Sequence, residues 1–363
     1  MRPADLLRRA GYAALVTGGR YLAWFYLMSL LLLVVPLAAQ APWTGQGVGL
    51  PAAEAVPRIG LTVSDMERSL AFYTGTLPFT VEADTEVAGR SWEQLTGVFG
   101  VRLRIVRLRL GDERLELTEY LAASTSGRPA PVDSRSNDRW FQHVAIIVSD
   151  MDGAYALLRA HRVKSASTGP QLLPKTIPGA AGIRAFYFRD PDGHPLEILQ
   201  FPADKGEPRW HRKSGLFLGI DHTAIVVANT ERSLGFYRDL LGLRVAGESH
   251  NRGDEQAHLN NVPGADLHIT GLRSADGPGV EFLEYLAPTD GRPIAPDERP
   301  NDLVHWQTSV LVRDFDRLSA RLDSAGVSRV SLEVSPLADR NLGALRSVLV
   351  RDPDGHVVQL IGR

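Results

Sequence analysis

The chain has 363 residues, 44% hydrophobic and 23% charged, which are ordinary values for a globular protein with room for two or three domains. Its 40 basic residues nearly balance 42 acidic ones, which argues against a nucleic-acid binder held by phosphate neutralisation. There is no cysteine, so disulfides, zinc-thiolate sites and thiol nucleophiles are excluded. Any metal must therefore be held by His, carboxylate or amide groups.

The first 41 residues have the features of a targeting segment. An uncharged, leucine-rich stretch at 21–39 follows a basic flank and would span about 28 Å, close to the thickness of a bilayer core. Ala39-Gln40-Ala41 has the small residues of a cleavage site, but Pro42 disfavours cleavage. We therefore expect residues 1–41 to be a signal peptide or a hydrophobic N-terminal helix that anchors the chain in a membrane. Both alternatives place the rest outside the cytoplasm, periplasmic or secreted.

The rest of the chain is a tandem duplication. Four motifs return at an offset of 162 to 165 residues: MERSLAFY at 66–73 as TERSLGFY at 230–237, SGRPAP at 126–131 as DGRPIAP at 290–296, Asn137-Asp138 as Asn301-Asp302, and RDPDGHPLEILQ at 189–200 as RDPDGHVVQLIG at 351–362. Four matches in one register are not expected by chance, so we expect the chain to consist of two similar halves.

Each half divides again into two similar units. A strand-like alternation in RIGLTVSDMERSLAFY leads to Asp65, a predicted helix cap, and HVAIIVSDMDGAYALLRAH at 143–161 has the same layout. Short alternating or apolar runs follow each helix, and Asp-Pro-Asp-Gly predicts a tight turn between the last two strands of the second and fourth units. The sequence thus predicts an α+β protein of four βαβββ units.

These four units resemble the vicinal oxygen chelate superfamily, which includes glyoxalase I, methylmalonyl-CoA epimerase, extradiol dioxygenases and bleomycin-resistance proteins. The resemblance rests on the SD-x-x-x-S-x-x-FY helix openings and the RDPDGHPLE strands, and it covers roughly residues 57–362. It implies two glyoxalase-like domains, at 57–201 (units 1 and 2) and 218–363 (units 3 and 4). Residues 42–56 and 202–217 are then expected to be linkers.

In this superfamily two units face each other, and their sheets form a cup with one ligand from the first and last strand of each unit. The matching positions are Arg58 and Glu116 in unit 1, His143 and Glu197 in unit 2, His222 and Glu281 in unit 3, and Gln307 and Gln359 in unit 4. Pairing in chain order would leave both cups incomplete. Crossed pairing, of unit 2 with 3 and unit 1 with 4, would collect both His–Glu pairs in one cup, and this sorting favours it.

The resemblance therefore implies one divalent metal ion held by His143, Glu197, His222 and Glu281. Two imidazoles and two carboxylates suit Fe, Mn, Co, Ni or Zn, and four ligands leave two positions for neighbouring substrate oxygens. Glu281 and Glu197 are candidate catalytic bases. Tyr187, ten residues before Glu197, resembles the tyrosine of the extradiol dioxygenase motif, although FYFRDPDG also favours an aromatic residue packed in the core.

We expect an enzyme that acts on a small molecule with neighbouring oxygens, a glyoxalase-type lyase or isomerase being favoured. A ring-cleaving extradiol-type dioxygenase is the alternative, and a binding or resistance protein without turnover is an alternative of another class. The expected partners are a small substrate and, through an uncleaved residue 21–39 segment, a membrane; no nucleic-acid partner is expected.

Overall fold

A computed structural model describes residues 53–122, 127–212, 214–339 and 343–362. The hydrophobic segment 21–39, predicted to be a signal or an anchor, lies outside these residues. Among the helices of the described ranges, none has the length and apolar character needed to cross a membrane.

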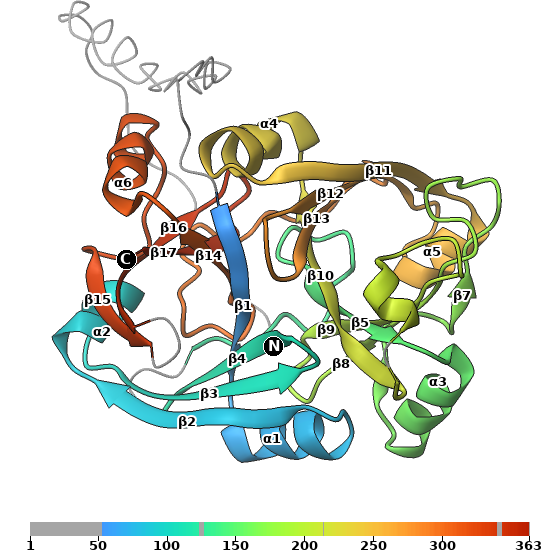
Figure 1. The fold of residues 1–363 in the computed structure, drawn as a ribbon, viewed down its shortest axis with the longest axis horizontal. Helices are drawn as coiled ribbons and strands as arrows, with labels where there is room; N and C mark the ends of the chain where they lie inside the picture. The colour runs from blue at the N-terminus through green and yellow to red at the C-terminus, as the bar shows by residue number, and fades with distance from the viewer. Residues whose placement is uncertain (1–52, 123–126, 213, 340–342, 363) are drawn as a thin grey trace, which may run out of the picture. The chain divides into compact units, whose positions relative to one another are not determined.

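Four repeats of strand, helix and further strands make up the described chain (Figure 1), which confirms the predicted units. Unit 1 comprises β1 (Ala53–Val63), α1 (Met66–Gly75), β2 (Thr80–Ala88), α2 (Arg90–Thr96), β3 (Arg102–Leu110) and β4 (Glu113–Tyr120). Unit 2 comprises β5 (Gln142–Val148), α3 (Met151–Ala160), β6 (Lys164–Ser165), β7 (Gln171–Leu172), β8 (Arg184–Arg189) and β9 (Pro195–Gln200).

The second half repeats this order after a 3₁₀ turn at Pro208–His211. Unit 3 comprises β10 (Phe217–Val227), α4 (Thr230–Leu234), a π-helical turn at Gly235–Leu240, β11 (Arg244–Arg252), α5 (Asp254–Asn260), β12 (Asp266–Arg273) and β13 (Gly279–Ala287). Unit 4 comprises β14 (Trp306–Val312), α6 (Phe315–Ser324), β15 (Ser335–Asp339), β16 (Gly343–Arg351) and β17 (Val357–Gly362).

Some bounds differ from the sequence-based expectation. The short helices α2 and α5 were not predicted, because seven residues are too few to show a helical period. Strand β1 begins at Ala53, within the range 42–56 that we expected to be a linker, and β10 begins at Phe217, at the end of the other expected linker.

The sheets join units that are not consecutive in sequence. One sheet has the order β15-β16-β17-β14-β1-β4-β3-β2 and so combines units 4 and 1. The other has the order β11-β12-β13-β10-β5-β9-β8-β6 and combines units 3 and 2. In each sheet the first strands of the two units pair antiparallel at the centre, β1 with β14 and β10 with β5. The crossed pairing predicted from ligand sorting is therefore confirmed.

The hydrophobic cores, in contrast, follow the chain order. One cluster joins units 1 and 2 around α1 and α3, with Met66, Tyr73, Met151 and Leu158 buried in it. A second cluster joins units 3 and 4 around α4 and α6. Each unit thus shares a sheet with one neighbour and a core with another, which locks all four together.

The helices begin where the sequence predicts. The side chains of Asp65 and Asn229 accept hydrogen bonds from the backbone N–H groups of Arg68 and Arg232, three residues further on. Asp314 caps α6 in the same manner, and Asp150 caps α3 by accepting from the backbone N–H of Asp152, two residues further on. These caps place the first strand of every unit in the same register relative to its helix.

The Asp-Pro-Asp-Gly-His turns have a structural role, as predicted. His194 Nδ1 lies 2.8 Å from Asp190 Oδ2, and its Nε2 lies 2.8 Å from the carbonyl oxygen of Leu303 in the other half. The equivalent His356 Nε2 lies 2.9 Å from the carbonyl oxygen of Val226. His194 therefore ties the β8–β9 turn to a loop of the other half, and His356 ties the β16–β17 turn to β10, a strand of the other sheet within the same half.

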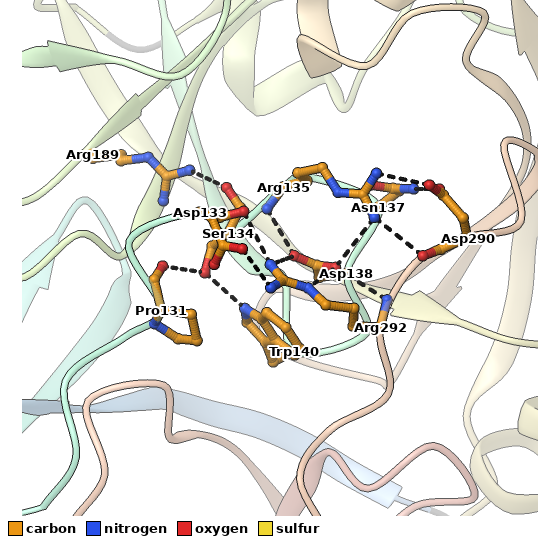
Figure 2. A network of polar contacts seen from close by, with 10 residues as sticks. All are labelled: Pro131, Asp133, Ser134, Arg135, Asn137, Asp138, Trp140, Arg189, Asp290 and Arg292. Atoms are coloured by element: carbon orange, nitrogen blue, oxygen red, sulfur yellow. Dashed lines mark hydrogen bonds and ion pairs between the residues drawn. The ribbon is translucent and has the colours of Figure 1, made fainter. Parts of the chain in front are cut away.

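The repeated Gly-Arg-Pro and Asn-Asp motifs form a reciprocal contact that we call the arginine clasp, made of the pairs Arg292–Asp138 and Arg128–Asp302. Figure 2 shows the first pair: the buried Asp138 carboxylate accepts hydrogen bonds from the backbone N–H and the guanidinium of Arg292, at 2.7 to 3.0 Å. The Arg292 guanidinium also stacks over the Trp140 ring. Arg128 binds Asp302 in the same way, so each half holds a loop of the other.

Candidate metal centre

The concave face of the sheet from units 2 and 3, which we call the histidine cup, collects all four predicted ligands. His143 lies on β5 and His222 on β10, the two central strands, while Glu197 and Glu281 lie on the flanking strands β9 and β13. Glu197 is opposite Ala145 of β5, and Glu281 is opposite Ala224 of β10. In both units the glutamate is therefore opposite the residue two positions after the histidine, so each histidine and its glutamate project from the same face of the sheet.

Glu197 forms the centre of the group. Its Oε2 atom lies 3.2 Å from His143 Nε2 and 3.8 Å from His222 Nε2. One donor atom from each of these three residues lies within 4.8 Å of the others, so that they could share one ion. Glu281 Oε1 lies 3.6 Å from His222 Nε2 and joins the group at its edge. The expectation that the two histidines share one cup is confirmed, and ligation itself stays a prediction.

The ring nitrogens of the two cup histidines fit a metal-binding site. Both ring nitrogens of His143, and Nε2 of His222, are buried without a hydrogen-bond partner among the residues that the structure describes. Leaving a buried polar atom unsatisfied costs about 1–3 kcal/mol, so such atoms are uncommon without a ligand. Two imidazoles beside two carboxylates form a donor set suited to a borderline divalent ion. The residues present therefore fit the metal that the resemblance implies.

Asp221 is a residue of this site that the sequence analysis missed. Its carboxylate lies 2.9 Å from His222 Nδ1 and accepts hydrogen bonds from Trp210 Nε1 at 3.0 Å and Arg273 Nη2 at 2.8 Å. In a regular strand, adjacent side chains point to opposite faces, but the pairing of β10 with β5 shifts register between Ile220 and His222. This bulge, which strand alternation does not reveal, lets two neighbouring side chains touch.

The pKa of Asp221 lies below its usual range. Burial opposes ionisation, but the hydrogen bond from His222 and the charge of Arg273 outweigh it. An ionised Asp221 accepts the Nδ1 hydrogen of His222, so that in the neutral ring the Nε2 lone pair is directed into the cup. That tautomer is the one that a metal ligand requires.

The carboxylates of the cup perturb each other and the histidine. Burial disfavours the His222 cation, yet Glu281, Asp221 and Glu197 outweigh it and raise the pKa of His222 to about 9. Burial also raises the pKa of Glu281, an effect that His222 opposes and Glu197 reinforces. A glutamate with a raised pKa is a better proton acceptor at neutral pH than an ordinary one.

Tyr187, the third predicted catalytic residue, is buried beside the cup. Its ring centroid lies 4.8 Å from that of His143, and it packs in the cluster that also holds Phe141 and Tyr285. Burial, then the charge of Glu197, raises the pKa of Tyr187 well above 10, so the phenol stays protonated. It can act as a hydrogen-bond donor next to His143, and its catalytic role stays a prediction.

The other concave face, formed by units 1 and 4, is here called the arginine cup. Arg58 Nε lies 3.0 Å from Glu116 Oε2, and its Nη2 donates to Gln359 Oε1 at 3.3 Å. Gln307 lies on β14 against Gly60 of β1. The four positions that hold histidine and glutamate in one cup thus hold a guanidinium, a glutamate and two amides in the other, as predicted.

Fold and site together define a protein of paired βαβββ units whose two cups differ, one with a donor set for a divalent ion. Consistent with this class, residues 55–198 and 219–360 both match the family described as the Glyoxalase/Bleomycin resistance protein/Dioxygenase superfamily, and the chain belongs to this superfamily.

Individual relatives differ in activity. A 2-epi-5-epi-valiolone epimerase from Actinomyces sp. is 36% identical over 168 residues, which is 43% of this chain and 85% of that protein. The glutathione transferase FosA of Serratia marcescens is 28% identical over 141 residues, which is 39% of this chain and 78% of that one. The crystal structure of glyoxalase I from Zea mays covers 85% of this chain and 92% of its own, with a TM-score of 0.54 at 16% identity, and so shares the fold.

Proposed function

We propose that the histidine cup is the active site of a divalent-metal-dependent isomerase or lyase that acts on a small molecule with neighbouring oxygens. The observation that carries the proposal is the convergence of His143, His222 and Glu197 within 4.8 Å, with Glu281 at 3.6 Å from His222. The enzymatic relatives in this superfamily support a catalytic role over a structural one.

Within that class, isomerisation by proton transfer is favoured. The relative with 36% identity is an epimerase by name, and epimerisation requires no oxidant or further reactant. A base takes a proton from a carbon next to a carbonyl, and the same carbon later receives a proton on its other face. Glu281 suits the part of the base because its pKa is raised by burial and its side chain is more exposed than that of Glu197, 25% against 5%.

A bound divalent ion would supply Lewis-acid polarisation of the substrate oxygens. The protein residues have separate tasks in this scheme. Asp221 holds His222 in one tautomer and orientation, and His143, His222 and Glu197 provide the donor atoms. The phenol of Tyr187 stays protonated and its ring lies 4.8 Å from that of His143, so it is available as a hydrogen-bond donor. Glu281 accepts the proton from one face of the substrate and releases it to water, and a proton from water reaches the same carbon on its other face.

The proposal is tested by proton exchange. The purified protein, loaded separately with Mn²⁺, Ni²⁺, Fe²⁺ or Zn²⁺, is incubated in D₂O with 2-epi-5-epi-valiolone and with simple α-hydroxy ketones. We expect deuterium to enter the carbon next to the carbonyl only with metal present, and Glu281→Gln to slow the exchange at least a hundredfold. Exchange at the same rate in Glu281→Gln, or in metal-stripped protein, would contradict this role.

A ring-cleaving dioxygenase is the second candidate, because His143, His222 and Glu197 also match the two-histidine, one-carboxylate set of non-haem iron oxygenases. Three protein ligands leave three positions for oxygen and a catechol. In that case Glu281→Gln should leave iron bound and oxygen consumption intact with catechols. Metal content separates both enzyme proposals from a binding protein without turnover, which would retain no ion after purification.

We also propose that the body of the chain works outside the cytoplasm, on the sequence of residues 21–39 and its basic flank alone. A reporter that is active only outside the cytoplasm, fused after Arg363, should be active. Retention in the membrane fraction would indicate an anchor, and release would indicate a cleaved signal. Activity of a cytoplasm-dependent reporter at that position would contradict both.

A further inference from the structure

The arginine cup holds a cavity of about 880 Å³, within the range of small-molecule binding sites. Its floor carries the side chains Arg58, Glu116, Gln307 and Gln359, at the four positions that match the predicted metal ligands of the other cup. Its walls include Trp92, Leu95, Leu103 and Ile105. A polar floor beneath apolar walls is typical of a site that orients a ligand by one end.

The Arg58 guanidinium takes the place that an ion would have. It contacts Glu116 at 3.0 Å and Gln359 at 3.3 Å, so it lies among the matching positions as a metal would among ligands. Arg107, which also lines the cavity, shares the Glu116 carboxylate at 3.3 Å. A planar guanidinium binds carboxylates through paired hydrogen bonds, so the positive charge that recognises substrate oxygens is here built into the chain.

The charges of the lining favour an anion. The ionised side chains around the cavity are Arg58, Arg90, Arg107, Glu82 and Glu116, which gives three positive charges against two negative ones. Glu82 also forms ion pairs with Arg109 and Arg114 outside the cavity, so its negative charge is already shared. A ligand with one carboxylate would neutralise the one excess positive charge of the lining.

His305 provides an independent observation. It is 4% exposed and lines the cavity, and its Nδ1 lies 2.8 Å from Glu298 Oε1. Burial opposes ionisation of Glu298, but His305 and Arg351 outweigh it and hold the pKa of Glu298 below its usual value, so Nδ1 is the donor. Nε2 is buried and has no hydrogen-bond partner within the described ranges of the chain. In the neutral ring this atom is an acceptor for a ligand hydroxyl.

The equivalent position in the histidine cup is Phe141, which packs in an apolar cluster. The His305–Glu298 pair therefore does not belong to the fold in general but to this cup.

From these contacts we propose that the arginine cup is a second, metal-independent binding site, whose ligand is a small cyclic carboxylate that carries a hydroxyl group. Arg58 binds the carboxylate, His305 accepts the hydroxyl hydrogen, and Trp92 with the leucine-rich walls covers the ring. The site is separate from the histidine cup and does not depend on the reaction proposed there.

Three fluorescent probes test the assignment on the EDTA-treated protein, with energy transfer from tryptophan as the readout: 6-hydroxy-2-naphthoate, 2-naphthoate and 2-naphthol. We expect one saturable site per chain and a preference of about tenfold for the hydroxylated carboxylate over each of the other two, which lack one polar contact each; tenfold is within the range of one hydrogen bond. No saturable binding, or equal affinity for 2-naphthol, would overturn the proposal.

Variants locate the site. His305→Phe introduces the residue of the other cup and should lower the affinity for 6-hydroxy-2-naphthoate to that for 2-naphthoate, while leaving 2-naphthoate unchanged. Arg58→Gln should remove the preference for a carboxylate. That change also leaves the buried Glu116 carboxylate without its ion pair to Arg58, which can destabilise the fold. Ile105→Trp therefore serves as a second variant: it fills the cavity without altering any charge and should abolish binding of all three probes. His222→Ala removes a predicted metal ligand of the other cup and should leave the affinity for all three probes unchanged. Loss of probe binding in His222→Ala, or its retention in Ile105→Trp, would refute the location.

Discussion

Asp221 accepts a hydrogen bond from the Nδ1 atom of its own neighbour in sequence, His222, over a distance of 2.9 Å. The contact exists because β10 bulges between Ile220 and His222, and it is reinforced by Trp210 and Arg273 on the same carboxylate. A histidine that donates from Nδ1 to a buried carboxylate is fixed in orientation, which is how many metal-binding imidazoles are supported.

Asp221→Asn should weaken metal binding by about 10- to 100-fold, the usual cost of losing the supporting partner of a metal-binding histidine. The affinity is measured by competition with a chromogenic chelator. Asp190→Asn is the matched control, because Asp190 holds His194 at 2.8 Å in a turn far from the cup's donor atoms. It should lower thermal stability and leave the metal affinity unchanged; equal losses of metal in both variants would mean that Asp221 acts only on the fold.

The pairing of units could be predicted from the sequence because ligand types repeat at fixed offsets from the helix caps. The family resemblance supplies the ligand positions once helix caps such as Asp65 and Asn229 are recognised, and both His–Glu pairs then fall in one cup. The internal repeat thus predicts which distant units pair, which the helix and strand propensities of single segments do not.

The supporting residues could not be predicted in the same way. Asp221 depends on a bulge, and Glu298 depends on the fold of the irregular loop that precedes β14, which brings it to His305 seven residues further on. Likewise Glu119 and Glu284 accept hydrogen bonds from the backbone N–H groups of Met66 and Thr230 at the starts of two helices. Such contacts arise from tertiary packing, which no sequence period encodes.

Substitutions in the histidine cup should reduce the metal content, and a matching substitution in the arginine cup should leave it unchanged. His222→Ala and Glu197→Gln each remove one of a few donors and should reduce bound metal more than tenfold, with little change in the circular dichroism spectrum. Gln359→Ala, at the position that matches Glu197 in the arginine cup, should retain the full metal content because Arg58 already occupies that place. Elemental analysis after dialysis decides; equal loss in Gln359→Ala and His222→Ala would place the metal elsewhere.

Metal affinity should rise with pH. The pKa of His222 is about 9 in the metal-free protein, so at neutral pH the ring carries a proton on Nε2 that an ion must displace. Because this pKa is raised, the competition is strongest at low pH and ends above pH 9, and affinity should increase by about tenfold per pH unit until then. Titration calorimetry at pH 7 in buffers of different ionisation enthalpy should show about one proton released per ion. Release of no proton would contradict ligation through Nε2.

The arginine clasp should control global stability without involving the predicted metal ligands. The Asp302 carboxylate accepts hydrogen bonds from the backbone N–H groups of Arg128 and Arg299 and from the Arg128 guanidinium, at 2.7 to 3.2 Å. Asp302→Ala leaves these donors without their acceptor in a partly buried place, and we expect a loss of about 3 kcal/mol in the free energy of unfolding.

The internal symmetry of the chain supplies a duplicate of this test. Asp138→Ala breaks the mirror contact to Arg292 and should cost a similar amount. Gly127→Ala should be worse than a typical surface change, since its Cβ would lie 1.8 Å from the carbonyl oxygen of Asn301.

Asp316→Ala provides the comparison for the clasp variants, because Asp316 pairs with Arg346 on the surface with its side chain 77% exposed and should contribute less than about 1 kcal/mol. Denaturant unfolding measures all four variants. Metal content in the folded state should stay at the wild-type level in each. If the clasp variants unfold no more easily than Asp316→Ala, the repeated Gly-Arg-Pro and Asn-Asp motifs do not hold the two halves together, and their return at a fixed offset needs another physical cause.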